Sequence, residues 1–192
     1  TSTGTEAKRF VYPVNAGTGK TALMGYLVCE KKYPHYFIRA TGDTYKTDFF
    51  KKCVAEQISK KYHLSGESEF WQALGTADKI CQEHNRREVI IVDGLDEQDR
   101  YGSQESEKII ALLKDHKFSQ ITFLVSSRPE LQNLSPDAIR IAMPPMQKED
   151  ITQYLERLGF NDLMQDNFVQ QLYEKSAGNT YYLKFIGEDL QQ

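Results

Sequence analysis

The chain has 192 residues, 27% of them charged, and a formal net charge of −3 at pH 7. That length is enough for one sizeable hydrophobic core, or for a domain with a small subdomain. The near-balanced charge gives no bulk signal for a nucleic-acid partner, and no apolar stretch approaches the roughly 20 residues of a membrane-spanning helix. The three cysteines are widely spaced and form neither a metal-binding pattern nor a disulfide framework. We therefore expect a reducing, cytoplasmic location and no signal peptide.

A short apolar run and a glycine-rich turn come first. Residues 1–8 are expected to form a flexible tail, and residues 9–14 to form a strand. The next segment, NAGTGKT at 15–21, agrees with the phosphate-binding pattern G-x-x-x-x-G-K-[ST], except that Val14 stands where the pattern begins with glycine. A helix is predicted from Thr21 onward. Strand, glycine turn and helix together place backbone N–H groups and a helix N-terminus around a phosphate.

The residues of this turn are the candidate nucleotide contacts. Lys20 is expected to reach the β- and γ-phosphates, and the Thr21 hydroxyl is expected to bind magnesium. The predicted cofactor-binding residues are Asn15, Ala16, Gly17, Thr18, Gly19, Lys20, Thr21 and Ala22. The alternative interpretation is a glycine turn followed by a solvated lysine, without a bound phosphate. A second motif is needed to decide between a nucleotide site and this alternative.

Beyond the turn, strand and helix patterns alternate as far as about residue 143. Strands are predicted at residues 36–38, 88–92, 121–125 and 138–141, and helices at 45–62, 68–83 and 104–115. The stretch after Glu88 is continuously apolar, which is typical of a buried parallel strand. The alternation predicts a parallel sheet with helices on both faces.

The pattern changes after Pro144 and Pro145. Helical spacing of apolar residues is found at 148–158, at 166–176 and from about residue 180, with no strand between these segments. Three short helices in succession predict a helical subdomain, and we place its boundary at 143–146.

A second motif, EVIIVDGLDE at residues 88–97, bears on the nucleotide site. The buried strand brings Asp93 to its carboxyl end, where open α/β sheets bind their ligands. In phosphoryl-transfer sites a carboxylate at this place holds magnesium, so Thr21 and Asp93 are the candidate metal residues. Asp96 and Glu97 are candidate catalytic acids, one of which would orient or deprotonate a water. A polar loop that caps a strand is the alternative.

A third motif, FLVSSRPE at residues 123–130, follows the next strand. Ser126, Ser127 and Arg128 are expected at the same sheet edge as Asp93. Arg128 there would sense the γ-phosphate or the charge that develops on it. Alternatively, Ser127 caps a helix that begins near Pro129, and Arg128 pairs with a surface acid.

Together the three motifs resemble the NACHT branch of the STAND class of P-loop NTPases, with D-G-L-D-E and S-S-R-P as the most distinctive elements. The similarity extends from about residue 9 to residue 190. It implies a three-layer α/β/α fold with a five-stranded parallel sheet in the order 2-3-4-1-5, followed by a small helical lid. It also implies ATP/ADP and Mg²⁺ as cofactors, and Asp96 as the catalytic acid with Glu97 second. The implied behaviour is a switch that is closed with ADP and able to assemble with ATP.

The resulting prediction divides the chain into a tail (1–8), a nucleotide-binding domain (9–143) and a helical lid (144–192). Its function would be that of a signalling ATPase core with slow magnesium-dependent hydrolysis. Its partners would be the nucleotide and other proteins or further copies, bound through regions outside this chain, with no membrane partner. Two residues depart from the family pattern, namely Val14 and Thr180, which stands where many relatives have a proline that packs on the nucleotide.

Two other functions remain open. An AAA+ remodelling ATPase usually has its catalytic acid directly after the magnesium aspartate, where this chain has Gly94. A degenerate P-loop domain that serves as an interaction scaffold is favoured by Val14. The residues that argue against it are Asp93, Asp96, Glu97 and Arg128. A preference for adenine is implied by the resemblance to the NACHT family.

Overall fold

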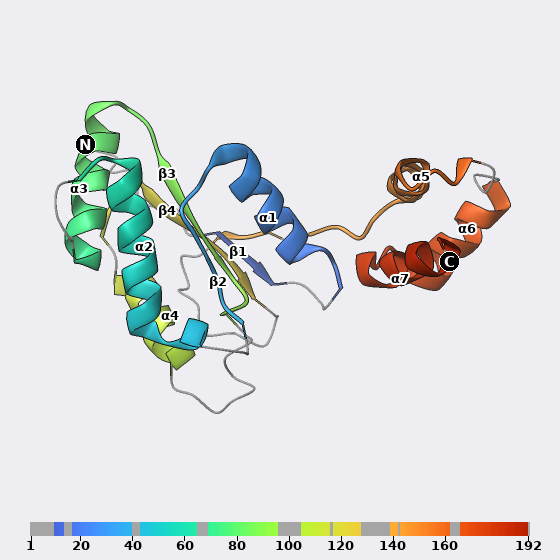
Figure 1. Cartoon of the computed structure of the whole chain (residues 1–192), viewed down its shortest axis with the longest axis horizontal. Helices are drawn as coiled ribbons and strands as arrows, with labels where there is room; N and C mark the ends of the chain where they lie inside the picture. Colours follow the sequence, from blue (N-terminus) through green and yellow to red (C-terminus); the bar gives the residue numbers. More distant parts are fainter. Residues whose placement is uncertain are drawn as a thin grey trace. The chain divides into compact units, whose positions relative to one another are not determined.

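The computed structural model describes residues 10–13, 17–39, 43–64, 69–95, 105–115, 117–127, 139–141, 143–161 and 166–191. Contacts between Cα atoms divide these residues into two compact units, and each is described here by itself (Figure 1). The first unit holds the described residues in 10–13 and 21–141. The second holds residues 17–20 together with those in 143–191. The predicted tail at 1–8 lies outside the described residues.

The first unit is built on a parallel sheet. Its strands are β1 (Phe10–Pro13), β2 (His35–Phe37), β3 (Glu88–Asp93), β4 (Ile121–Ser127) and β5 (Ile139–Arg140). They lie in the order β2-β3-β4-β1-β5, and each neighbouring pair is parallel. All seven residues of β4 are buried, as expected for a central strand with helices above and below it.

Helices cover both faces of this sheet (Figure 1). They are α1 (Lys20–Lys31), which enters the first unit at Thr21, α2 (Thr47–Lys61), α3 (Phe70–Glu83) and α4 (Glu105–Asp115), with a 3₁₀ turn at Asp43–Tyr45. Ile90 and Val92 of β3 pack in the cluster formed by α2, α3 and α4, whereas Ile91 packs with Met24 of α1. Successive side chains of a strand point to opposite faces, so the apolar run of β3 serves two cores at once. The predicted parallel sheet with helices on both faces is confirmed.

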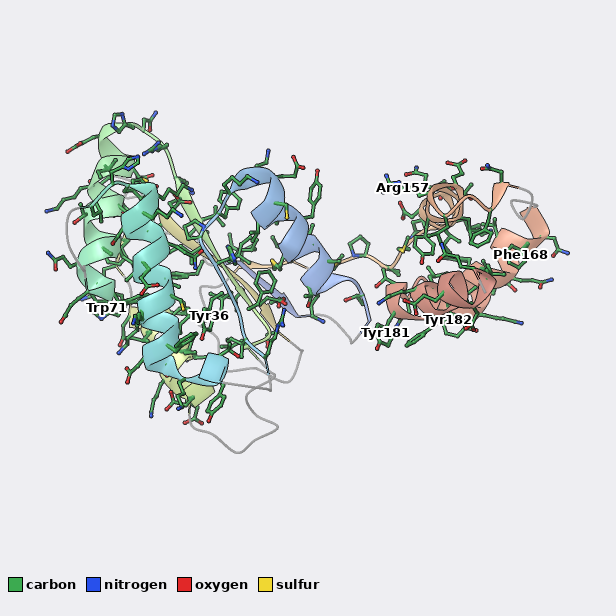
Figure 2. All side chains as sticks on the ribbon, in the orientation of Figure 1. Tyr36, Trp71, Arg157, Phe168, Tyr181 and Tyr182 are labelled. Carbon is green, nitrogen blue, oxygen red and sulfur yellow. The ribbon has the colours of Figure 1, made fainter. Side chains whose placement is uncertain are left out.

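An aromatic contact fixes α2 on the sheet. The Tyr36 ring meets the Phe50 ring edge-on, with 5.3 Å between the ring centroids (Figure 2). The Tyr36 hydroxyl donates a 2.7 Å hydrogen bond to the Thr44 carbonyl oxygen. This bond gives the polar end of a buried tyrosine a partner and ties the 3₁₀ turn at Asp43–Tyr45 to β2.

The second unit contains three helices, α5 (Lys148–Arg157), α6 (Asp166–Ser176) and α7 (Thr180–Leu190). Their small core contains Ile151, Leu155, Val169, Leu172 and Leu183. These helices agree with the patterns found in the sequence, while the domain boundary at 143–146 stays a prediction. Within the residues that the structure describes, no helix is both long and apolar enough to cross a membrane.

Candidate nucleotide site

Three strand ends meet at the carboxyl edge of the sheet. The β3–β4 register pairs Val92 with Val125, so Asp93 and Ser126 follow next to each other along the two strands. On the other side of β4, the β1 register pairs Pro13 with Ser127. The carboxyl end of β1 therefore lies at the same edge as Asp93, Ser126 and Ser127, and the second and third motifs predict this edge for those three residues.

Asp93 is a buried carboxylate in a fixed orientation. It is 4% exposed, and the Ser126 hydroxyl donates a hydrogen bond to its Oδ1 atom. The Ser126 oxygen in turn accepts a hydrogen bond of 3.2 Å from the Gly94 backbone N–H. The Asp93 carbonyl accepts a 2.9 Å bond from the Ile38 N–H, which ties β3 to the end of β2. A buried charge needs such partners, and here they also orient it.

Ser126 bonds the Asp93 carboxylate, a contact that the sequence motifs do not predict. The third motif predicts a phosphate contact for Arg128 and, for Ser126, only a place at the same sheet edge as Asp93. The signal that points to its partner is the strand register, because two parallel strands of known register bring Asp93 and Ser126 side by side. That register becomes certain only when the sheet forms.

Two glycines of the turn before α1 adopt left-handed backbone conformations. Gly17 has a φ of +79° and Gly19 a φ of +85°, in the left-handed region that favours glycine. Helix α1 then begins at Lys20, and its first turn, all of which the structure describes, carries no acidic side chain. The positive end of the α1 dipole therefore has no carboxylate of that turn beside it, which favours an anionic ligand.

The predicted site residues fall into three groups. Those in the second unit are Gly17, Thr18, Gly19 and Lys20, and those in the first unit are Thr21, Ala22 and Asp93. Thr21 and Ala22 are exposed in the first turn of α1. The predicted site residues outside the described part of the chain are Asn15, Ala16, Asp96, Glu97 and Arg128. Their roles stay predictions.

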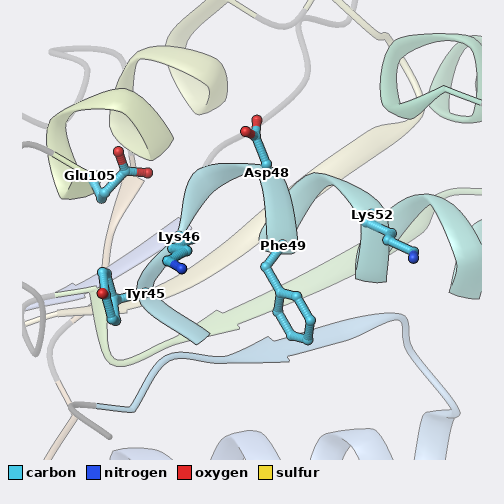
Figure 3. Close-up of a pocket in the computed structure, with 6 residues that line it drawn as sticks. All are labelled: Tyr45, Lys46, Asp48, Phe49, Lys52 and Glu105. Atoms are coloured by element: carbon cyan, nitrogen blue, oxygen red, sulfur yellow. The ribbon is translucent and has the colours of Figure 1, made fainter. Parts of the chain in front are cut away.

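A surface pocket of about 500 Å³ lies at the N-terminus of α2 (Figure 3). Its lining residues are Tyr45, Lys46, Asp48, Phe49, Lys52 and Glu105. The Glu105 carboxylate accepts a 2.7 Å bond from the Thr47 N–H and contacts the Lys108 ammonium. The hydrogen bond from Lys108, followed by those from Thr47, lowers the pKa of Glu105 to about 2. Glu105 thus caps α2 as an anion, and the described lining residues of this pocket all lie outside the three sequence motifs.

The parallel sheet, the glycine turn before α1 and the buried aspartate at the end of β3 define a P-loop NTPase fold. The model of the NACHT domain family matches residues 15–162. The chain therefore belongs to the NACHT domain family, which the sequence motifs predicted.

Solved structures with this fold include several nucleotide-dependent proteins. A STAND protein with a tetratricopeptide repeat sensor from Pyrococcus horikoshii is 16% identical, with a TM-score of 0.56 over 95% of this chain and 28% of that one. A Walker-type ATPase of Pyrococcus abyssi is 14% identical, with a TM-score of 0.56 over 93% of this chain and 61% of that one. The ORC2 protein of Aeropyrum pernix, in ADPNP and ADP complexes, is 14% identical, with a TM-score of 0.53 over 94% and 55%.

At these identities the likeness shows the fold alone. This chain spans less than a third of the STAND protein and less than two thirds of the other two. No curated protein matches the chain by sequence.

Proposed function

We propose that this chain is the ATP- and ADP-binding core of a NACHT-type signalling NTPase, in which the bound nucleotide selects the conformation and ATP is hydrolysed slowly. The observation that carries the proposal is the buried Asp93 carboxylate, which Ser126 holds at the carboxyl end of β3. A carboxylate at this edge of a parallel sheet is where a phosphate-bound metal ion is expected. Membership of the NACHT family supports the interpretation that this carboxylate takes part in nucleotide binding.

The glycine turn would bind the phosphates. The backbone N–H groups of Gly17, Thr18 and Gly19 would form the cradle, together with Asn15 and Ala16. Helix α1 begins at Lys20, so the Lys20 ammonium and the backbone N–H groups of the first turn would contribute positive charge on the same side. The left-handed φ values of Gly17 and Gly19 fit this role, because they allow successive N–H groups to converge on one anion.

The metal and catalytic roles belong to carboxylates and one arginine. The Thr21 hydroxyl and the Asp93 carboxylate would hold magnesium, whose preferred ligands are oxygen atoms. Magnesium, when bound, neutralises charge on the β- and γ-phosphates. Asp96, with Glu97 as second candidate, would accept the proton of the attacking water, and Arg128 would contact the γ-phosphate.

Membership of the NACHT family also leads us to propose a location and a kind of partner. The protein would act in the cytoplasm, and its signal would pass through protein partners or through self-association. Regions outside this chain would carry those contacts, since the STAND neighbour is more than three times as long as the part that this chain covers.

Calorimetric titration with ATP, ADP and GTP, each with and without magnesium, tests the proposal. Lys20→Ala should weaken ATP binding by about ten- to hundredfold, because a hydrogen bond to a charged group contributes roughly 1.5–3 kcal/mol. Lys31→Ala, at the other end of the same helix, is the matched control and should bind as the parent does. Asp93→Asn should weaken binding of ATP with magnesium far more than binding of metal-free ATP.

Three results would contradict the proposal. Equal affinity of the parent and the Lys20→Ala variant would remove the phosphate-binding role of the turn. Failure of every nucleotide to bind would favour the interaction scaffold. Fast turnover that rises with protein concentration through ring assembly would favour an AAA+ remodelling ATPase.

A further inference from the structure

The N-terminus of α7 holds the carbonyl group of the glycine turn. The Thr180 hydroxyl donates a 2.7 Å hydrogen bond to the Gly17 carbonyl oxygen, and the Tyr181 backbone N–H donates a second bond of 3.2 Å to the same oxygen. Gly17 and Thr180 are 163 positions apart in the chain, yet both belong to the second unit. Two donors on one oxygen satisfy both of its lone pairs.

Asn179 adds a close contact at the same place. It is the N-cap of α7, and its Oδ1 atom accepts hydrogen bonds from Tyr181 N at 2.9 Å and Tyr182 N at 3.2 Å. Its side chain also lies directly against Gly17, where an added Cβ atom would be 2.4 Å from Oδ1. Tyr181 N–H is thus shared between the cap and the turn. The contact therefore requires both a glycine at position 17 and the capped start of α7.

The start of α7 is itself tied to the segment that precedes α5. The Gly178 carbonyl accepts a 3.1 Å bond from Met146 N, and a Cβ atom at Gly178 would lie 2.4 Å from the Met146 carbonyl oxygen. At Gly19, the other glycine of the turn, an added Cβ atom would lie 3.4 Å from Thr180 side-chain atoms and 3.5 Å from Met143 Cε. The turn therefore contacts two segments of the second unit, the start of α7 and the segment that precedes α5.

Peptide geometry gives this anchor a consequence for ligand binding. The described peptide bonds are all trans, so the C=O of Gly17 and the N–H of Thr18 point in opposite directions within one plane. Because α7 holds the carbonyl, the Thr18 N–H is directed away from α7. Fixing one end of this peptide fixes the direction of an amide in the phosphate turn.

We propose that Thr180 is a positioning residue for the phosphate turn, which it orients through the Gly17 carbonyl and thereby couples to the helical unit. The part that concerns ligand affinity rests on the proposed nucleotide binding. The anchoring itself is a property of the ligand-free chain and is tested without nucleotide. Residue 180 is one of the two departures from the family pattern, so the proposal also gives that departure a role of its own.

The first experiment measures backbone motion by ¹⁵N relaxation in the ligand-free chain. Thr180→Val keeps the shape of the side chain but removes the hydroxyl, so the order parameters of Thr18 and Gly19 should fall from about 0.85 to below about 0.6. Thr180→Ser keeps a hydroxyl and should restore the parent values. Thr152→Val is the matched control, because the Thr152 hydroxyl bonds only the Lys148 carbonyl of its own helix among the described contacts. Unchanged order parameters in Thr180→Val would overturn the proposal.

The second experiment measures ADP affinity of the same variants by calorimetry. Thr180→Val should raise the Kd roughly 2- to 10-fold, the range of one neutral hydrogen bond, while Thr180→Ser and Thr152→Val should stay within about twofold. A mobile turn with unchanged ADP affinity would overturn the positioning role. Failure of the parent chain to bind ADP would refute the proposed function instead, and the relaxation result would still decide the anchor.

Discussion

Removal of the Ser126 hydroxyl tests whether the carboxylate at the end of β3 is held as described. In Ser126→Ala, the Asp93 Oδ1 atom loses a donor and the Gly94 N–H loses an acceptor at a position that is 1% exposed. A hydrogen bond to a charged group contributes about 1.5–3 kcal/mol, and a buried polar group left without its partner costs a similar amount. We expect Ser126→Ala to lower the free energy of unfolding by about 2 kcal/mol.

A matched control is available in the same unit. Ser59 Oγ is buried and has no hydrogen-bond partner among the described residues, so Ser59→Ala makes the same chemical change without breaking a bond. We expect Ser59→Ala to be neutral or slightly stabilising, because the buried hydroxyl is already unsatisfied. Urea denaturation followed by circular dichroism gives both values, and the m-value shows whether the unfolding transition stays comparable.

The same variant separates structure from binding. If Asp93 acts through magnesium, Ser126→Ala should weaken binding of ATP with magnesium and leave binding of metal-free ATP nearly unchanged, since only the carboxylate has lost its orientation. A loss of stability no greater than that of Ser59→Ala would refute the reasoning. So would an equal loss of affinity with and without magnesium.

Three further predictions concern other charged groups. Glu88 is buried and accepts hydrogen bonds from Tyr62 and Lys61 at 2.5 and 2.8 Å, so Glu88→Ala should cost about 2 kcal/mol in urea denaturation, because a hydrogen bond to a charged group contributes about 1.5–3 kcal/mol. The lowered pKa of Glu105, about 2, means that the unfolded chain binds the proton first as the pH falls. The stability from Glu105 is therefore complete above about pH 4.5 and is lost as the pH falls toward 2. In Glu105→Gln the free energy of unfolding should therefore change less with pH between 4.5 and 2, by up to about 1 kcal/mol. The effect is no larger because solvent screens the Glu105–Lys108 ion pair. An unchanged pH dependence would contradict the cause given for the pKa of Glu105. Asp96→Asn should bind ATP as the parent does but fail to release phosphate in a colorimetric assay, and unchanged hydrolysis would transfer the role to Glu97 or exclude both.

Local sequence patterns predicted the elements of both units well. The apolar run after Glu88 and that of residues 121–125 became β3 and β4, because an uninterrupted apolar stretch of this length is stable only when buried on both faces. The observed β4 continues to Ser127, two residues past the apolar run. Two serines extend a strand here because they pair with Tyr12 and Pro13 of β1, and that pairing has no trace in local periodicity.

The sequence by itself determined the order and type of the elements, the glycine turn before α1, the place of Asp93 at a strand end and the NACHT family. All of these follow from residues close together in the chain, where spacing and residue type act directly. The tertiary structure decided which side chains meet. Ser126 bonds a carboxylate 33 positions away, and Thr180 bonds a carbonyl 163 positions away. Serine and threonine hydroxyls bond almost any nearby polar group, so their partners are set by strand register and helix packing, which exist only once the chain has folded.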